Sequence, residues 1–329
     1  MVLAQFYILI YNYIKCRGKH CCGNLPLNGS DDKKKGIPMK KIFIVGSLNY
    51  DLVINAPYMP VGGETLKGSD FMTNAGGKGA NQAYACGKLG GEIYMCGAVG
   101  NDSFGDTLLG SLNGVGVNTD FVKRVDGVST GVAIIVVTEG ENRIIIDSGA
   151  NACVEKEDID KFLEKAEKGD IFLTQLENPI DIVGYGLKVA KEKGLLVVLN
   201  PAPASLEIKK YLKYVDIITP NETELEILGG KDEIFSQGVE TIITTLGASG
   251  YEIATKDGSK IYPCIKVKAV DTTAAGDTAS GGLCVKLAEG KSIEEAMAFG
   301  SLCASIACTK RGAQMSVPSL DEVEKYKNN

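Results

Sequence analysis

A run of small residues followed by a carboxylate stands near the end of the sequence. Residues 270–278 read VDTTAAGDT, and residues 279–288 continue with the apolar periodicity of a helix. Small residues ahead of a helix let backbone N–H groups converge at the positive end of its dipole, which suits an anion such as a phosphoryl group. Asp277 lies in the first turn of this predicted helix, where a carboxylate can accept a proton. The alternative is that Asp277 only caps the helix, as Asp often does.

A glycine-rich turn precedes a second predicted helix. Residues 74–82 read NAGGKGANQ, and small or apolar residues continue at helical spacing as far as Gly87. The spacing is not that of a P-loop. Glycines let a ligand approach the backbone closely, and Lys78 and Asn81 can donate to hydroxyl groups. A tight turn with a solvated lysine is the alternative.

Three further polar turns each follow an apolar run. Residues 46–51 read GSLNYD, in which Asn49 and Asp51 point to one side of an extended chain; they either meet a polyol or form an Asn/Asp turn. Residues 219–224 read TPNETE, where Asn221 and Glu224 either cap a helix or hold water around Mg²⁺ and a triphosphate. Residues 245–250 read TLGASG, and this open turn suits a flat nucleotide ring.

These turns need elements that bring them to one place. Short apolar runs typical of buried parallel strands recur at residues 41–46, 171–173, 195–199, 215–219 and 241–245. Helical patterns over residues 157–168 and 180–193 separate several of them. Alternating strands and helices predict an α/β fold, in which helices cover both faces of a mostly parallel sheet. Ligands of such sheets bind beyond the carboxyl ends of the strands, where these turns lie.

Two segments break this alternation. Residues 52–73 and 130–150 show strand-like patterning with Gly and Pro but little helix. They predict a small β-sheet that lies as a lid across the mouth of the main sheet. Because no repeat or low-complexity linker interrupts residues 39–329, we expect them to form one domain with this lid.

The composition limits the chemistry. A net charge of −6 disfavours nucleic acid as a partner. His20 is the only histidine, so residues 39–329 contain neither a Ser-His-Asp triad nor a His-ligated zinc site. Proton transfer there must use Asp, Glu, Lys, Tyr or Cys. Apart from Cys16, Cys21 and Cys22, the cysteines stand singly in apolar stretches, which is typical of thiols in a reducing cytosol. We therefore expect a cytoplasmic location.

Residues 1–38 do not read like the rest. Residues 2–14 are partly apolar, but this stretch is too short to span a membrane and lacks the basic start of a signal peptide. Four metal-ligand types stand close together, but no second pair follows: Cys16, His20, Cys21 and Cys22. We expect a disordered extension, or a start assigned too early with Met39 as the working initiator.

The turns, in this order, give residues 39–318 a resemblance to the ribokinase-like superfamily of sugar kinases. The most specific strings are GGKGANQ at residues 76–82, NPAPA at 200–204 and DTTAAGD at 271–277. The last is typical of the whole superfamily, whereas the first two favour the ribokinases over the fructokinases and adenosine kinases. The resemblance implies a central α/β sheet and a β lid through which two chains pair as a homodimer.

The resemblance also implies a role for single residues. Asp277 is the catalytic base, and the anion hole consists of Ala274, Ala275 and Gly276. The sugar set comprises Asn49, Asp51, Gly76, Gly77, Lys78, Asn81, Glu177 and Asp277. The ATP set comprises Asn221, Glu224, Thr245, Gly247, Gly250, Gly276 and Ser301. The cation set, which holds a monovalent ion (usually K⁺), comprises Asp271, Thr273, Ala307, Lys310, Gly312 and Ser316. An ordinary salt bridge from Asp271 to Lys310 or Arg311 is the alternative to the ion.

The sequence departs from the family pattern in three places. Residues 229–239 are shorter than the usual helix-containing segment, which leaves their local structure open. Ser301 stands where the family has an asparagine near adenine, and residues 1–38 have no counterpart.

The resemblance implies that the γ-phosphoryl group of ATP, held with Mg²⁺, is transferred to the 5-hydroxyl of D-ribose. The alternatives are a superfamily kinase acting on deoxyribose, fructose or a nucleoside, and a sugar-binding regulator without turnover. We expect no membrane and no nucleic acid among its partners.

Overall fold

The structure is a computed structural model that describes residues 39–139 and 141–327. The extension expected at residues 1–38 lies outside the described residues, and so do the metal-ligand types Cys16, His20, Cys21 and Cys22. The predicted domain boundary at Met39 therefore stays a prediction. None of the described helices is both long and apolar enough to cross a membrane.

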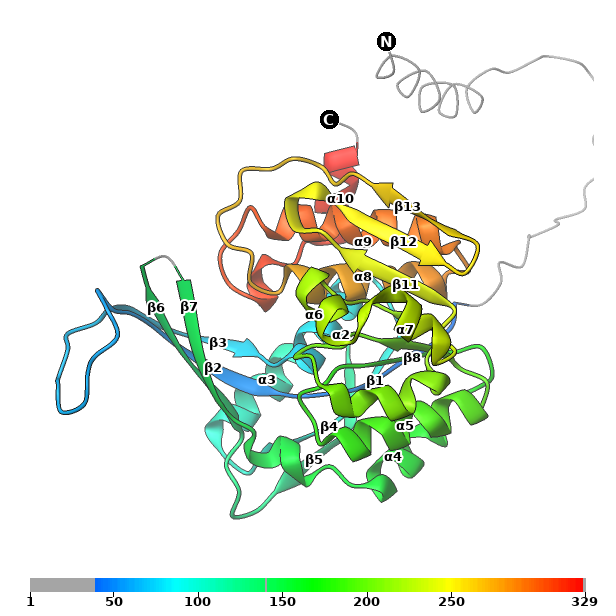
Figure 1. The fold of residues 1–329 in the computed structure, drawn as a ribbon. Helices are drawn as coiled ribbons and strands as arrows, with labels where there is room; N and C mark the ends of the chain where they lie inside the picture. Colours follow the sequence, from blue (N-terminus) through cyan, green and yellow to red (C-terminus); the bar gives the residue numbers. More distant parts are fainter. Residues whose placement is uncertain (1–38, 140, 328–329) are drawn as a thin grey trace, which may run out of the picture. The chain divides into compact units, whose positions relative to one another are not determined.

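The main sheet has nine strands in the order β13-β12-β11-β10-β9-β8-β1-β4-β5 (Figure 1). Neighbours from β11 to β5 run parallel, whereas β12 is antiparallel to both β11 and β13. The strands are β1 (Ile42–Val45), β4 (Ile93–Gly100), β5 (Asn118–Val125), β8 (Ile171–Thr174), β9 (Leu196–Leu199), β10 (Ile217–Ile218), β11 (Thr241–Thr245), β12 (Tyr251–Thr255) and β13 (Gly258–Tyr262). The predicted α/β fold with a mostly parallel sheet is confirmed.

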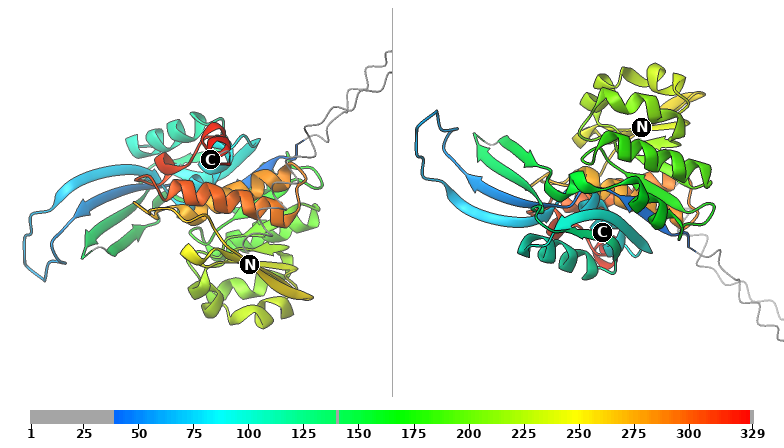
Figure 2. Two further views of the ribbon diagram at one scale, coloured as in Figure 1. Left: turned by 90° about the horizontal axis from the view of Figure 1, so that it is seen from above. Right: turned by 90° about the horizontal axis from the view of Figure 1, so that it is seen from below.

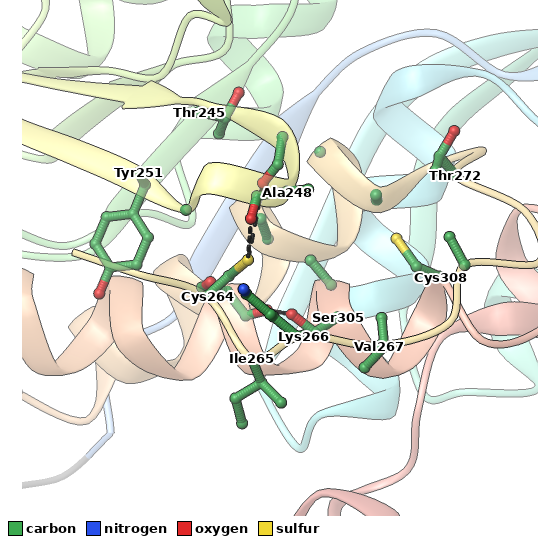
Figure 3. A pocket seen from close by; sticks show the side chains of 18 of the residues that line it. Thr245, Ala248, Tyr251, Cys264, Ile265, Lys266, Val267, Thr272, Ser305 and Cys308 are labelled. Carbon is green, nitrogen blue, oxygen red and sulfur yellow. Dashed lines mark hydrogen bonds between the residues drawn. The ribbon is translucent and has the colours of Figure 1, made fainter. Parts of the chain in front are cut away.

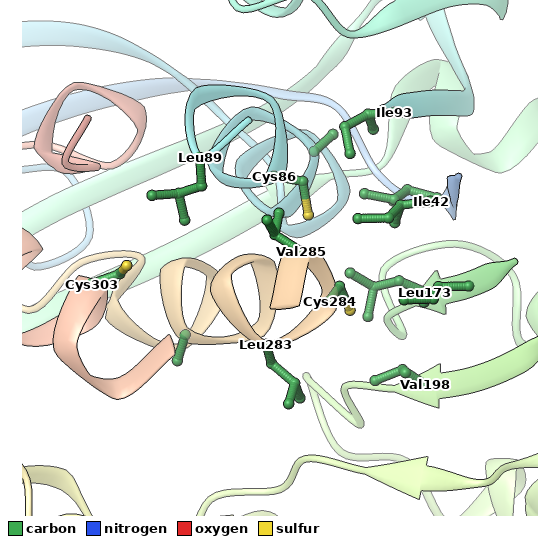
Figure 4. Close-up of a cluster of buried hydrophobic side chains, with 14 of the residues drawn as sticks. Ile42, Cys86, Leu89, Ile93, Leu173, Val198, Leu283, Cys284, Val285 and Cys303 are labelled. Carbon is green, nitrogen blue, oxygen red and sulfur yellow. The ribbon is translucent and has the colours of Figure 1, made fainter. Parts of the chain in front are cut away.

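Both faces of the main sheet are buried because its central strands are apolar throughout. Side chains alternate along a strand, so Ile42 and Ile44 of β1 join one hydrophobic cluster and Phe43 and Val45 join the other. Figure 4 shows part of the first cluster, between the sheet and helices α2 (Lys78–Lys88) and α8 (Ala275–Ala288). The two clusters hold the carboxyl ends of the strands in fixed positions.

The helices divide between these two clusters. Besides α2 and α8, the first cluster receives side chains from α3 (Ser103–Asn113), α9 (Ile293–Ala307) and α10 (Leu320–Lys327). The second receives side chains from α4 (Lys156–Leu163), α5 (Ile180–Glu192), α6 (Glu222–Ile227) and α7 (Gly230–Ser236).

A separate sheet of four strands forms the predicted lid. Its order is β3-β2-β6-β7, and only the β2–β6 pair is parallel. It projects from the main sheet as a curved blade (Figures 1 and 2). Only residues 46–48 separate β1 from the first lid strand, so the lid is anchored directly beside the carboxyl end of β1. The strands are β2 (Asn49–Asn55), β3 (Ser69–Gly76), β6 (Gly131–Thr138) and β7 (Glu141–Asp147).

Two local expectations need comment. The helix predicted over residues 157–168 ends at Leu163. There the N–H groups of Lys165 and Ala166 bond to carbonyls only three residues earlier, those of Phe162 and Leu163, and these tighter bonds replace the α-helical pattern. The short segment at residues 229–239, whose structure the sequence left open, still contains a helix, α7.

Candidate active site

Asp277 is the third residue of α8, directly after a tight loop. Ala274 precedes the helix in the left-handed conformation (φ 57°), and this turns the chain into α8. The N–H of Ala275 donates to the Thr272 carbonyl at 3.2 Å, which closes the turn. The N–H groups of the first helical turn have no carbonyl ahead of them in the helix, so this end of α8 can bind an anion.

The Asp277 carboxylate is bonded to α2 and not to its own helix. Its Oδ2 accepts from Nδ2 of Asn81 at 3.1 Å, and its Oδ1 accepts from Nε2 of Gln82 at 2.9 Å. Only 7% of the residue is exposed. Capping, which the sequence left as the alternative, does not explain a carboxylate held across to another helix.

Glu177 connects the other members of the sugar set. It follows β8, and its Oε2 accepts from Nδ2 of Asn49 at 3.4 Å and from the backbone N–H of Lys78 at 3.1 Å. The Ser47 hydroxyl donates to the same oxygen at 2.5 Å. The structure therefore brings together residues from the lid, the start of α2 and the end of β8.

Two glycines of the set are required by close packing. Gly77 precedes α2 with φ 86°, and a Cβ built there would lie 2.6 Å from the backbone nitrogen of Asn49. A Cβ on Gly76 would overlap the Asp51 carboxylate. A side chain at Gly77 would push the start of β2 away from α2, and one at Gly76 would displace the Asp51 carboxylate, so these glycines let the lid residues reach the site.

Three carboxylates and one ammonium share this region. Burial raises the pKa of Asp51 to about 7, and the negative charges of Glu177 and Asp277 add to the shift. Burial alone would lower the pKa of Lys78, but the charges of Asp277, Glu177 and Glu224 outweigh it and raise that pKa. These effects place Asp51 within electrostatic reach of Glu177 and Asp277, and Lys78 within reach of the same two carboxylates and of Glu224, a fourth carboxylate.

A cavity of about 490 Å³ adjoins the N-terminal end of α8 (Figure 3). Five members of the ATP set line it: Thr245, Gly247, Gly250, Gly276 and Ser301. Sequence reasoning missed other lining residues, including Tyr251, Cys264, Lys266, Ser305 and Cys308. Some of these lie on residues 264–269 and on α9, where no motif marks them, because only folding brings that segment and that helix against the turn after β11.

Asn221 and Glu224 are not among the residues that line this cavity. They form a capping box at the start of α6, with both backbone-to-side-chain distances at 2.8 Å, so the capping alternative is realised. Asn221 also pairs with Thr245 as an isolated β-bridge, which places α6 next to the cavity.

Burial raises the pKa of Glu224, and the charge of Asp277 adds to the increase, whereas the backbone N–H of Asn221 and the charge of Lys78 oppose it. Glu224 thus lies within electrostatic reach of Asp277.

Three members of the cation set meet at the loop before α8: Asp271, Thr273 and Gly312. The Asp271 carboxylate accepts from the backbone N–H groups of Thr273 and Gly312, both at 2.9 Å. Burial raises the pKa of Asp271. Hydrogen bonds from the Thr273 side chain and from the backbone N–H groups of Gly312 and Thr273, together with the charge of Arg311, outweigh burial and lower that pKa. Lys310 pairs with Glu322 at 2.6 Å and not with Asp271. Arg311, the other partner considered, lowers the pKa of Asp271 through its charge but forms no salt bridge with it in the described residues.

Sequence reasoning also missed polar residues behind the sugar set. Asn151 donates from Nδ2 to Oδ1 of Asn49 at 2.8 Å and accepts from the Leu48 N–H at 2.9 Å, which orients the Asn49 amide. Gln82 was part of the glycine-turn string but received no role. Its position next to Asn81 was the only available signal.

The sequence is similar to those of known carbohydrate kinases. The model of the pfkB family of carbohydrate kinases matches residues 39–320. The chain belongs to this family. A ribokinase of Haemophilus influenzae is 40% identical to this carbohydrate kinase over 300 residues, covering 87% of this chain and 98% of that protein. The predicted membership of the superfamily is confirmed.

Two further similar proteins are a deoxyribokinase and a ribokinase of known structure. A deoxyribokinase of Salmonella typhi is 36% identical over 299 residues, covering 87% of this chain and 98% of that protein. The solved structure of Arabidopsis thaliana ribokinase complexed with ribose and ATP is 32% identical, with a TM-score of 0.77, and covers 87% of this chain and 98% of that chain.

Proposed function

We propose that this kinase transfers the γ-phosphoryl group of ATP to the 5-hydroxyl of D-ribose, giving ribose 5-phosphate and ADP. One observation carries the proposal: Asp277 belongs to both halves of the site. Its carboxylate is bonded to the sugar set through Asn81, and its backbone lies in the first turn of α8, at the end of the nucleotide cavity. The relatives with ribokinase activity support this assignment.

In the proposed reaction, Asp277 accepts the proton of the 5-hydroxyl group while the oxygen of that hydroxyl forms a bond to the γ-phosphorus. The bond from that phosphorus to the bridging oxygen breaks, and ADP leaves. Negative charge on the transferred group faces the loop of Ala274, Ala275 and Gly276 and the positive end of the α8 dipole. Most of the rate acceleration comes from positioning and charge stabilisation, because the transition state of such transfers is loose.

Mg²⁺ would accompany the triphosphate at the α6 side. Glu224 fits this role because its carboxylate is close enough to influence Lys78 and Asp277, although it also caps α6. A carboxylate that binds through water suits Mg²⁺, which keeps several waters. Asn221, beside Thr245, would lie between the ion and the nucleotide cavity.

The cation set fits a monovalent ion better than a divalent one. Asp271 is its only carboxylate, and the other donors would be backbone carbonyls and the Ser316 hydroxyl. In the described residues, no group of three or more His, Cys, Asp or Glu side chains is arranged to hold a metal. A K⁺ ion there would neutralise Asp271 and steady the loop that ends in the anion hole.

A turnover assay with several acceptors tests the assignment. Ribose should exceed fructose in kcat/KM by ~10²-fold or more, because polar groups aimed at particular hydroxyls are left unpaired by the wrong sugar. Deoxyribose is the sharpest competitor, since a deoxyribokinase is also among the relatives. If deoxyribose, fructose or a nucleoside gave a higher kcat/KM than ribose, that compound would be the acceptor in place of ribose. If none of the four acceptors caused ATP consumption, the result would favour a sugar-binding regulator.

We also propose that two copies pair through the lid. Six large apolar side chains are exposed on three of its strands: Phe71, Met72, Ile134, Ile144, Ile145 and Ile146. In register, Ile134 of β6 lies opposite Ile145 of β7 and Leu52 of β2, so these apolar residues share one face of the lid across three strands, whereas Ile144 and Ile146 lie on the other face. A second lid is the partner that fits the face of Ile134 and Ile145. The cytoplasmic location that the sequence predicts stays a prediction.

A further inference from the structure

We propose that Gln82 is a positioning residue for Asp277: its buried amide fixes one oxygen of the base, and is itself fixed by residues at the ends of two sheet strands. The inference rests on the proposed role of Asp277 as base. Gln82 is fully buried in α2, next to Asn81, and it donates to Asp277 and not to any other member of the sugar set.

The Gln82 amide uses both of its N–H groups. Nε2 lies 2.9 Å from Oδ1 of Asp277 and 3.1 Å from Oδ1 of Asn200. Its Oε1 accepts from Nε2 of Gln175 at 2.6 Å. Gln175 directly follows β8 and Asn200 directly follows β9, so the amide is held from two neighbouring strands of the rigid main sheet.

The orientation of this amide is determined by chemistry. Nδ2 of Asn200 donates to the Thr219 carbonyl at 3.0 Å, so Oδ1 of Asn200 must face Gln82. An ionised Asp277 can only accept. A reversed Gln82 amide would place its oxygen against two acceptors, and its N–H groups against the N–H groups of Gln175. The observed orientation of the Gln82 amide gives Asp277 and Asn200 a donor each and gives Gln175 an acceptor, whereas Oε1 of Gln175 is buried without a hydrogen-bond partner.

The two oxygens of Asp277 are therefore held by different kinds of partner. Oδ2 is bonded to Asn81, which the resemblance assigns to the sugar. Oδ1 is bonded to Gln82, which lies behind it and is tied to β8 and β9. A substrate can replace the first contact while the second remains. Gln82 would keep the carboxylate aligned with the hydroxyl when the lid and the sugar move, and alignment of this kind determines kcat.

The test is a double-mutant cycle between Gln82→Met and Asp277→Asn. Methionine has a similar length and shape but no donor. In the parent chain, Gln82→Met should lower kcat between ~10- and ~100-fold, the range expected for a hydrogen bond to a charged group. The KM for ribose, and its Kd by calorimetry, should change less than threefold. In the Asp277→Asn background, Gln82→Met should change the residual rate less than twofold, because the residue acts only through the base.

A structural role gives a different pattern. If Gln82→Met lowered kcat by the same factor in both backgrounds, or left kcat unchanged in a folded protein, Gln82 would not be a positioning residue. If Asp277→Asn itself kept full turnover, the proposed base would fail first, so the two failures are distinguishable.

Gln82→Met leaves Asn200 and Gln175 without one hydrogen-bond partner each and could therefore destabilise the fold. A second variant tests the proposal independently of that effect. Gln175→Met removes the contact that holds the far side of the Gln82 amide and does not touch Asp277. It should lower kcat in the same direction but less, again only when Asp277 is present. Equal losses of kcat with and without Asp277 would overturn the proposal even if Gln82→Met did not fold.

Discussion

The Nδ2 atom of Asn81 lies 3.1 Å from Oδ2 of Asp277, although 196 positions separate them in the chain. The contact joins the first turn of α2 to the first turn of α8. Each of these helices begins after a glycine- or alanine-rich turn, so the N-terminal ends of two helices meet at one carboxylate. In the proposed reaction, this contact would place a sugar at α2 beside a phosphoryl group at α8.

Replacing the base tests this arrangement most directly. Asp277→Asn should lower kcat by at least ~10²-fold, the usual scale for a positioned general base. Ribose binding, measured by calorimetry, should weaken only a few-fold because the amide keeps the shape of the carboxylate. Near-normal turnover in the folded variant would show that Asp277 does not accept the proton.

The raised pKa of Asp51 predicts a pH-dependent KM. Sugar hydroxyls donate to an ionised carboxylate, and with a pKa of about 7 Asp51 is mostly protonated below that pH and mostly ionised above it. The KM for ribose should therefore rise about tenfold between pH 8 and pH 6, in proportion to the loss of the ionised form. Initial rates over a range of ribose concentrations at each pH measure it.

Asp51→Asn is the control for this dependence. It should raise the KM at pH 8 and remove most of its change with pH. A wild-type KM that stayed constant from pH 8 to pH 6 would show that ribose binding does not depend on the Asp51 charge.

The cation set predicts activation by potassium. Ribose phosphorylation at fixed ionic strength should be several-fold faster in K⁺ than in tetramethylammonium, because a bound ion steadies the loop at the anion hole. Asp271→Ala should abolish the difference, whereas Asp321→Ala, which removes an acid outside the set, should preserve it. Equal rates in all salts would argue against an ion at this position.

Pairing through the lid can be tested by replacing exposed apolar residues of the lid with lysine. Ile144 and Ile145 are 53% and 64% exposed and are neighbours on β7, so their side chains point to opposite faces of the lid. The double variant Ile144→Lys with Ile145→Lys should turn a dimer into a monomer in light scattering. Leu206→Lys with Ile227→Lys charges exposed apolar residues outside the lid and should leave the dimer intact. A monomeric parent chain would contradict the proposed pairing.

Two cysteines report occupation of the nucleotide cavity. Cys264 and Cys308 line it and are half-buried, whereas the half-buried Cys153 lies elsewhere. ATP should slow the labelling of Cys264 and Cys308 by N-ethylmaleimide, read by peptide mass spectrometry, and should not affect Cys153. If ATP protected none of the three more than the others, the nucleotide would bind outside this cavity.

Local patterns were enough to identify the motifs and five of the nine strands of the main sheet, whereas β4, β5, β12 and β13 were not predicted. The apolar run at residues 41–46 predicted β1 because a strand buried on both faces needs apolar residues at every position, and the structure buries all four residues of β1. The GGKGANQ string predicted the turn before α2 because the backbone there needs glycine. Such features depend only on residues that are close together in the chain, so they can be predicted from the sequence.

Other features depend on distances that only folding sets. The sequence expected a helix to continue to residue 168, but α4 ends at Leu163. The lining of the nucleotide cavity by Cys264 and Lys266 had no signal in the sequence, because no motif covers residues 264–269 and only folding brings them to the cavity.

The sequence by itself determined the fold class, the family and the identity of Asp277 as the candidate base. These follow from periodicity and from short strings whose backbone needs restrict the residue types. The tertiary structure alone decided how that base is held. Gln82, Gln175 and Asn200 come from α2 and from the ends of β8 and β9, and their amides meet only because the parallel sheet brings its carboxyl ends to one edge. The pKa of Asp51 was decided in the same way, because burial and two distant carboxylates act through space and not along the chain.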